Sequence, residues 1–131
     1  MPKLHTVLIV DDDASLRATL ESVLAPKLRV LTAADPDTAY ALLGVEPVTA
    51  VLLDVRLPTM SGLALSLAIM HRWPQLTGRI ALMTGDADAA DVRAWVRRNP
   101  CVLFRKPFSP RQILDWLDTV VRLADRAASA G

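Results

Sequence analysis

The sequence predicts an α/β fold, a doubly wound parallel sheet of five strands with helices on both faces. Short apolar runs rich in valine, isoleucine and leucine alternate with longer segments of helical period, five of each. The run at residues 48–53 is apolar nearly throughout, which is typical of a strand buried on both faces of a parallel sheet. Such alternation implies right-handed crossovers that place helices on both sides of the sheet.

The first half of the chain is predicted to contain three strands and two helices. Asp13 is placed to cap the first helix, because its carboxylate can accept hydrogen bonds from the first turn. Asp35 before Pro36 gives the same signal for the second helix, which Gly44 and Pro47 are expected to end. The predicted elements are a strand at 6–10, a helix at 13–26, a strand at 28–31, a helix at 35–43 and a strand at 48–53.

The second half continues the alternation with two strands and three helices. A loop at 57–62 precedes the third helix, and Ser109 before Pro110 repeats the capping signal at the last one. Apolar residues cover about half the circumference of the last helix, which is wide for a helix lying on a single sheet. The predicted elements are a helix from 62 to about 71, a strand at 80–83, a helix at 88–98, a strand at 101–104 and a helix from 110 to about 127.

Length and composition indicate a single domain at 1–131, with a core at about 5–124 and a C-terminal tail at 125–131. Apolar residues make up 52% of the chain and charged residues 22%, which excludes a disordered chain and a coiled coil. The net charge of +1 argues against a dedicated nucleic-acid binder. No apolar run approaches the roughly 18–20 residues of a membrane span. We therefore expect a cytoplasmic protein without direct nucleic-acid or membrane contacts.

Polar side chains follow four of the predicted strands. Alone, each has an ordinary explanation as a loop residue or a helix cap. The carboxyl ends of parallel strands meet at one edge of the sheet, where ligands bind, so we expect these side chains to converge. They are Asp11 and Asp12 after the first strand, Asp54 after the third, Thr84 after the fourth and Lys106 after the fifth.

Three carboxylates beside one ammonium leave a surplus of negative charge that would destabilise the fold unless it is compensated. A divalent cation is the natural compensation, and oxygen ligands without histidine or cysteine favour Mg²⁺, Mn²⁺ or Ca²⁺ over zinc. A metal, an ammonium and a hydroxyl together can hold a phosphoryl group. A carboxylate can itself be the nucleophile and form an aspartyl phosphate.

These motifs resemble the receiver domain of bacterial two-component response regulators. The resemblance covers about residues 5–123 and is carried by the motifs at 10–12, 53–62, 83–85 and 106–108. It implies the flavodoxin-like strand order 2-1-3-4-5. It also implies a signalling domain that accepts a phosphoryl group with Mg²⁺ and then changes its binding to a partner.

The resemblance assigns a role to each site residue. Asp54 is the expected phosphoryl acceptor. Thr84 is expected to bond a phosphoryl oxygen, and Lys106 is expected to pair with the phosphoryl group. The peptide bond between Lys106 and Pro107 is expected to be cis. The expected Mg²⁺ ligands are Asp11, Asp12, Asp54 and the backbone carbonyl of Arg56.

The resemblance also implies partners. A histidine kinase or phosphotransfer protein would donate the phosphoryl group, and the fourth and fifth helices would form an output or dimer surface. No output domain is recognisable in the sequence, so the chain would be a stand-alone receiver or a part of a larger regulator or hybrid histidine kinase.

Two departures from the family pattern bear on the mechanism. Members usually carry an aromatic residue three positions before the lysine, and Leu103 stands there, with Phe104 beside it. Arg56 and Asp86 occupy positions that commonly tune the phosphoryl lifetime, and their opposite charges could pair across the site or be solvated. Because Leu103 replaces the usual aromatic residue, one alternative is a degenerate receiver that acts as a constitutive interaction module.

A second alternative is a Mg²⁺-dependent phosphohydrolase with an aspartyl-phosphate intermediate. Such enzymes commonly carry another aspartate two positions after the nucleophile, where this chain has Arg56.

Several residues outside the motifs also have two interpretations. Trp95 and Trp116 are expected at the periphery of the core, with a docking surface as the alternative. Cys101 is expected to be an inert core thiol within a strand. On the third helix, Leu65 and Ile69 are expected to be exposed, opposite a stripe formed by Leu63, Leu67 and Met70.

Overall fold

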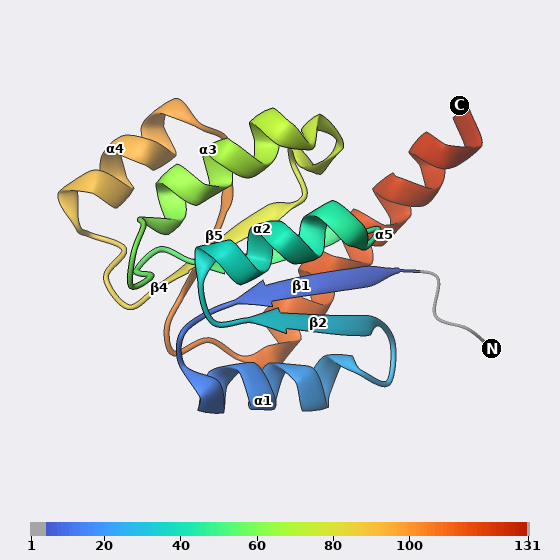
Figure 1. Cartoon of the computed structure of the whole chain (residues 1–131), viewed down its shortest axis with the longest axis horizontal. Helices are drawn as coiled ribbons and strands as arrows, with labels where there is room; N and C mark the ends of the chain where they lie inside the picture. Colours follow the sequence, from blue (N-terminus) through green and yellow to red (C-terminus); the bar gives the residue numbers. More distant parts are fainter. Residues whose placement is uncertain (1–4, 131) are drawn as a thin grey trace.

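A computed structural model describes residues 5–130 and confirms the α/β fold. Five parallel strands form one sheet in the order β2-β1-β3-β4-β5, as expected, with helices on both faces (Figure 1). The strands are β1 (Thr6–Val10), β2 (Arg29–Ala33), β3 (Ala50–Asp54), β4 (Ile80–Thr84) and β5 (Val102–Arg105). The helices are α1 (Ala14–Leu24), α2 (Pro36–Val45), α3 (Gly62–Arg72), α4 (Ala90–Arg98) and α5 (Pro110–Ala130), with a 3₁₀ turn at Pro74–Leu76.

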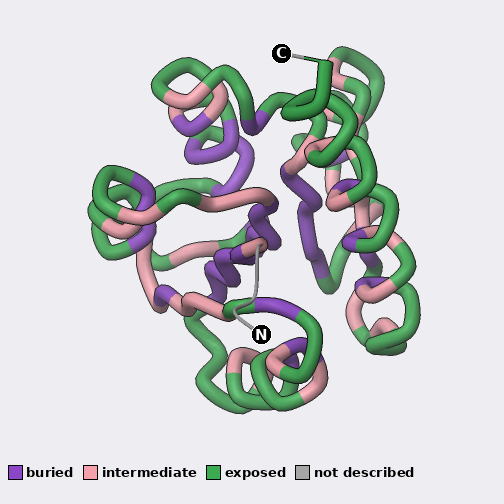
Figure 2. Tube along the Cα trace, turned by 90° about the vertical axis from the view of Figure 1, so that its right-hand side faces the viewer, coloured by how far each residue is buried: buried purple, intermediate pink, exposed green. Residues whose placement is uncertain are grey.

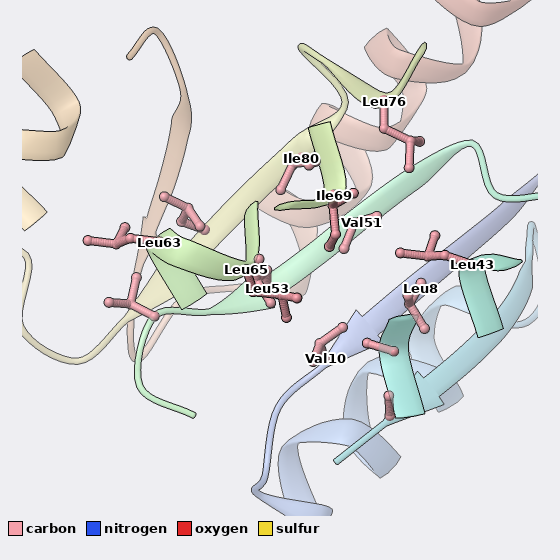
Figure 3. Close-up of a cluster of buried hydrophobic side chains, with 14 of the residues drawn as sticks. Leu8, Val10, Leu43, Val51, Leu53, Leu63, Leu65, Ile69, Leu76 and Ile80 are labelled. Atoms are coloured by element: carbon pink, nitrogen blue, oxygen red, sulfur yellow. The ribbon is translucent and has the colours of Figure 1, made fainter. Parts of the chain in front are cut away.

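The sheet separates two hydrophobic clusters. Successive side chains of a strand point to opposite faces. Leu8 and Val10 of β1 pack with α2 and α3 (Figure 3), whereas Val7 and Ile9 pack with α1 and α5. Buried residues therefore lie along the middle of the molecule, between two helical layers (Figure 2). All five residues of β1, of β3 and of β4 are buried, which explains their apolar composition.

Side-chain caps begin α1 and α2 where the sequence predicts them. Asp13 accepts hydrogen bonds from the backbone N–H groups of Ser15 and Leu16 at 2.9 and 3.2 Å. Asp35 accepts one from Thr38 at 2.8 Å, with Pro36 at the first helical position. These bonds satisfy N–H groups that have no partner within the helix.

Several predicted boundaries are wrong by one to three residues. α2 does not stop at Gly44 but continues to Val45, because the chain becomes extended only at Glu46, before Pro47. Cys101 lies one residue before β5 rather than within it. α5 continues to Ala130 as one helix, so the backbone has no break at residue 124. Residues 1–4 and 131 of the expected domain lie outside the described residues.

The predicted exposed face of α3 is wrong. Leu65 and Ile69 are buried, with exposed fractions of 2% and 0%, whereas Leu67 is 51% exposed. The buried face of α3 also contains Ser66, whose hydroxyl donates to the carbonyl of Leu63 at 2.8 Å. This buried polar residue interrupts the apolar stripe, so the hydrophobic pattern alone indicates the wrong face.

The first described residue contacts the last helix and the loop before β3. The imidazole of His5 lies 2.8 Å from a carboxylate oxygen of Asp125 on α5 and 2.9 Å from the hydroxyl of Thr49. The last turns of α5 extend beyond the sheet (Figure 1). Within residues 5–130, no helix is both long and apolar enough to cross a membrane.

Candidate functional site

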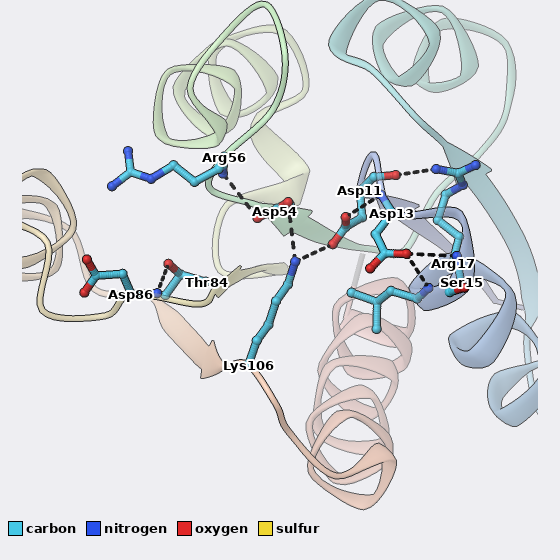
Figure 4. Close-up of polar contacts among 10 residues, drawn as sticks. Asp11, Asp13, Ser15, Arg17, Asp54, Arg56, Thr84, Asp86 and Lys106 are labelled. Carbon is cyan, nitrogen blue, oxygen red and sulfur yellow. Dashed lines mark hydrogen bonds and ion pairs between the residues drawn. The ribbon is translucent and has the colours of Figure 1, made fainter.

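The carboxyl edge of the sheet gathers the predicted site residues. Asp11 directly follows β1, Asp54 is the last residue of β3 and Thr84 the last residue of β4. Lys106 follows β5, and the Lys106–Pro107 peptide bond is cis, as expected. Figure 4 shows Asp11, Asp54 and Lys106 pointing toward one another from these separate strands.

An ion-pair network joins three of these side chains. The Lys106 ammonium lies 2.8 Å from Asp11 Oδ2 and 3.4 Å from Asp54 Oδ2. Asp11 is fully buried and Asp54 is 5% exposed. Two buried carboxylates therefore share one ammonium, and the centre of the site keeps an excess of negative charge.

Hydrogen bonds from neighbouring residues fix the orientation of both carboxylates and the backbone of Asp11. Asp11 Oδ1 accepts a hydrogen bond from the N–H of Asp13 at 2.9 Å, and the guanidinium of Arg17 donates to the carbonyl of Asp11 at 2.7 Å. Asp54 Oδ1 accepts one from the N–H of Arg56 at 3.2 Å. Each carboxylate thus has one oxygen held by the backbone and the other directed at Lys106.

The surroundings shift the pKa of two site residues. Burial raises the pKa of Asp54 above its ordinary value, assisted by the negative charge of Asp11, although the Arg56 N–H and Lys106 act in the opposite direction. For Lys106, burial lowers the pKa, but the hydrogen bond and charge of Asp11 and the charge of Asp54 outweigh it and raise the pKa overall.

The carboxylates meet the requirements of a hard divalent cation. Asp11, Asp12 and Asp54 each offer an oxygen, and these oxygens all lie within 4.8 Å of one another. Asp12 is exposed, so the cluster is open to solvent on its side. Mg²⁺ prefers one or two carboxylates together with water, and this donor set fits it. The role of the Arg56 carbonyl as a further ligand stays a prediction.

Thr84 lies deep in the same edge. It is 1% exposed, and its hydroxyl accepts a hydrogen bond from the N–H of Asp86 at 3.0 Å. Its carbonyl accepts one from the N–H of Lys106 at 2.7 Å. Thr84 and Lys106 are therefore joined by a backbone hydrogen bond.

Gly62, the last residue of the predicted loop at 57–62, supports the site in a way that the loop pattern does not indicate. Its N–H donates to the carbonyl of Val55 at 2.7 Å, and a Cβ at this position would overlap the backbone carbonyl of Asp54. The first turn of α3 thus rests directly on the backbone that carries Asp54. The motif of Ser61 before glycine marks the helix start, but only the fold reveals the close approach.

Arg56 pairs with Asp91, a residue that no sequence motif singles out. Its guanidinium donates two hydrogen bonds to the carboxylate of Asp91 on α4, at 2.7 and 2.9 Å. Neither of the alternatives considered for Arg56, pairing with Asp86 or full solvation, is therefore realised.

The aromatic and apolar residues of α4, β5 and α5 divide between the two hydrophobic clusters. Trp95 is half-buried against the α3 side of the sheet and Trp116 against the α5 side, so both lie at the periphery of the core, as expected. Leu103 packs at the edge of the first cluster, whereas Phe104 packs against Trp116 in the second. Cys101 is half-buried, and burial raises the pKa of its thiol despite a hydrogen bond with Trp95.

Comparison with known proteins connects this geometry to a family. The family model for the response regulator receiver domain matches residues 7–118. This chain belongs to the receiver domain family. Receivers are signalling domains of two-component systems, and they bind Mg²⁺ at an acidic pocket such as the cluster described above.

Two relatives and one solved structure illustrate the similarity. The hydrogenase transcriptional regulatory protein HoxA of Cupriavidus necator is 34% identical over 86% of this receiver and 23% of its own length. The DNA-binding transcriptional regulator NtrC of Salmonella typhimurium is 36% identical over 94% of this receiver and 24% of its own length. The receiver thus spans about a quarter of these relatives. A CheY-like receiver from Methanospirillum hungatei JF-1 shares the fold, with 24% identity and a TM-score of 0.79, over 98% of this chain and 100% of its own.

Proposed function

We propose that this receiver accepts a phosphoryl group on Asp54 from a phosphohistidine donor and that the modified form binds a partner differently. The observation that carries the proposal is the position of Lys106, whose ammonium bridges the buried carboxylates of Asp11 and Asp54 at 2.8 and 3.4 Å. This arrangement presents a held carboxylate oxygen next to a cation that can accompany an anionic group.

The transfer step uses Asp54 as nucleophile. A carboxylate oxygen of Asp54 attacks the phosphorus atom, the bond from phosphorus to the donor imidazole nitrogen breaks, and its electron pair stays on that nitrogen. The product is an acyl phosphate on Asp54. The N–H of Arg56 orients the carboxylate, and Lys106 offsets the negative charge of the arriving oxygens.

The acidic cluster supports a dependence on Mg²⁺. Asp11, Asp12 and Asp54 would hold the ion, with the Arg56 carbonyl as a further ligand. The chemistry that the ion supplies when bound is neutralisation of charge between the carboxylates and the phosphoryl oxygens. Without it, an anionic donor would approach an edge that already carries excess negative charge.

The same residues suggest how modification would reach a partner. The Thr84 hydroxyl is expected to turn from the N–H of Asp86 to a phosphoryl oxygen, and Lys106 to follow the phosphoryl group. The loops after β4 and β5 lead into α4 and α5, which we propose as the output or dimer surface. A histidine kinase or phosphotransfer protein is the proposed donor, and neither nucleic acid nor a membrane is a proposed direct partner.

The two alternatives are less well supported. A phosphohydrolase needs a group that protonates the leaving oxygen, and the guanidinium of Arg56, two residues after Asp54, is bound to Asp91 and keeps its proton. A degenerate receiver is disfavoured by the complete ion-pair network around Lys106.

Phosphorylation with a small donor tests the proposal. Incubation with acetyl phosphate or phosphoramidate and Mg²⁺ should add the mass of one phosphoryl group, and the Asp54→Asn variant should remain unlabelled. Asp35→Asn is the matched control, because it removes a carboxylate at a helix cap where asparagine can still accept the capping hydrogen bond from Thr38. Equal labelling of Asp54→Asn, or labelling that persists in excess chelator, would contradict the proposal.

A further inference from the structure

We propose that Arg56 is a positioning residue that links the acceptor site to α4. Its guanidinium holds Asp91 while Asp54 is unmodified and turns to the phosphoryl group once Asp54 carries one. The inference rests on the proposed function and adds to it a route by which the site acts on α4.

Arg56 contacts both ends of this route. Its backbone N–H donates to Asp54 Oδ1 at 3.2 Å, which places the residue at the rim of the site. Its side chain extends away from Asp54 (Figure 4), and the two terminal nitrogens donate to Asp91 Oδ2 and Oδ1 at 2.7 and 2.9 Å. One residue thus joins the loop after β3 to the first turn of α4.

The ion pair is placed to exchange partners. The Arg56 and Asp91 side chains are 55% and 47% exposed, so water can replace either of them, and exposed pairs of this kind add little to stability. A phosphoryl group carries more negative charge than a carboxylate and accepts the same two parallel hydrogen bonds from a guanidinium. Since the backbone of Arg56 already touches Asp54, a change of rotamer would turn its side chain toward the acceptor.

The first turn of α4 has few other attachments. Among the residues of α4, all of which the structure describes, Val92 alone is buried. Ala89, at the N-cap, provides no side-chain hydrogen bond, and Asp91 is the acidic residue of the first turn. Release of Asp91 would therefore remove the side-chain ion pair between this end of α4 and the site loop, while the apolar contacts of Ala89 and Val92 with the core remain.

The affinity for beryllium fluoride with Mg²⁺, which mimics a phosphoryl group on Asp54, tests the competition. Asp91→Asn frees Arg56 and should tighten the affinity about two- to fivefold, the range that exposed ion pairs allow. In an Arg56→Gln background the same substitution should have no effect beyond that of losing one negative charge, because the competing guanidinium is absent. Asp91→Glu, which can restore the pair, should return the affinity toward that of the unsubstituted protein.

Asp88→Asn is the charge-matched control. Asp88 lies in the loop before α4, and its carboxylate is 3.9 Å from Arg105 rather than bound to Arg56. Any effect of Asp88→Asn should be the same with and without Arg56, since it reflects only the loss of one negative charge.

Side-chain and amide NMR signals provide an independent readout. On addition of the mimic, the Arg56 Nε–H signal and the amides of residues 90–93 should shift, and in Asp91→Asn the amides of residues 90–93 should respond less, because Arg56 no longer releases them. If the mimic binds but these signals stay in place, or if Asp91→Asn acts equally in both backgrounds, Arg56 is not the link, and the phosphoacceptor function is unaffected. If the mimic does not bind and Asp54 is not labelled, both proposals fail.

Discussion

At the scale of single residues, Asp54 is held in a state that costs stability. Burial raises the pKa of its carboxyl above the ordinary 3.8. A carboxyl with a raised folded-state pKa contributes stability below the unfolded pKa, and that contribution is lost as the pH rises through the folded value. The ionised form of Asp54 is therefore energetically disfavoured in the folded chain, and the charge of Lys106 compensates this only in part.

The raised pKa of Asp54 leads to a prediction for the stability of the metal-free protein. Asp54→Asn should have a higher free energy of unfolding than the unsubstituted chain at pH 7, with the difference shrinking as the pH falls toward 4. Urea unfolding in a chelator measures it. Asp35→Asn is a control of opposite sign, because hydrogen bonds from Thr38 lower the pKa of Asp35, so its stabilising contribution is present at pH 7 and lost on acidification. Parallel pH profiles for Asp54→Asn and the unsubstituted chain would rule out the strained carboxylate.

At the scale of secondary-structure elements, the contact of α3 with β3 fixes the backbone of Asp54. Gly62→Ala would force a Cβ against the Asp54 carbonyl, so either the helix or the site loop must move. We expect a loss of about 1–3 kcal/mol in unfolding free energy, typical of an overpacked site, together with slower labelling by acetyl phosphate.

Gly44→Ala is the matched control for this prediction. Gly44 lies in α2, and a Cβ there meets nothing within 4 Å. In a helix, alanine in place of glycine should stabilise by up to about 1 kcal/mol. Urea unfolding of both variants gives the comparison, and a Gly62→Ala variant as stable as Gly44→Ala would show that the close approach is not needed.

The order of the elements and most of their caps could be predicted from the sequence because these features are local. Asp13 and Asp35 cap the helices that directly follow them, and β1 was predicted with its observed bounds. The orientation of α3 could not be predicted, since the buried Ser66 satisfies its hydroxyl within the helix and breaks the apolar stripe. A hydrophobic pattern predicts the buried face of a helix only when all the residues on that face are apolar.

The site was predictable to a similar extent. Asp11, Asp54 and Lys106 converge because parallel strands end at one edge, a rule that needs only the order of the elements. The partner of Arg56 was not predictable, because Asp91 is distant from it in sequence. Several other acidic residues, including Asp86, lie closer to Arg56 along the chain. A pairing of this kind depends on where the folded chain places α4.

At the scale of the whole molecule, the fold assembles a charged site that only the folded chain possesses. The three carboxylates come from the ends of β1 and β3, and the buried network around Lys106 brings in the end of β5. A ligand that binds the folded state and not the unfolded chain stabilises by mass action. Metal binding at this cluster would therefore be coupled to the global stability of the fold.

The final prediction follows from this coupling. Mg²⁺ at ten times its dissociation constant should raise the free energy of unfolding by about 1.4 kcal/mol, measured as a higher urea midpoint than in chelator. Asp12→Asn should reduce this effect, because Asp12 supplies one of the three clustered oxygens. The same substitution should raise stability in chelator, because it removes a like charge beside Asp11 and Asp54. Asp118→Asn, which removes an exposed carboxylate on α5, should leave the Mg²⁺ effect intact. A midpoint indifferent to Mg²⁺, or equal responses of the two variants, would show that the acidic cluster does not hold the ion.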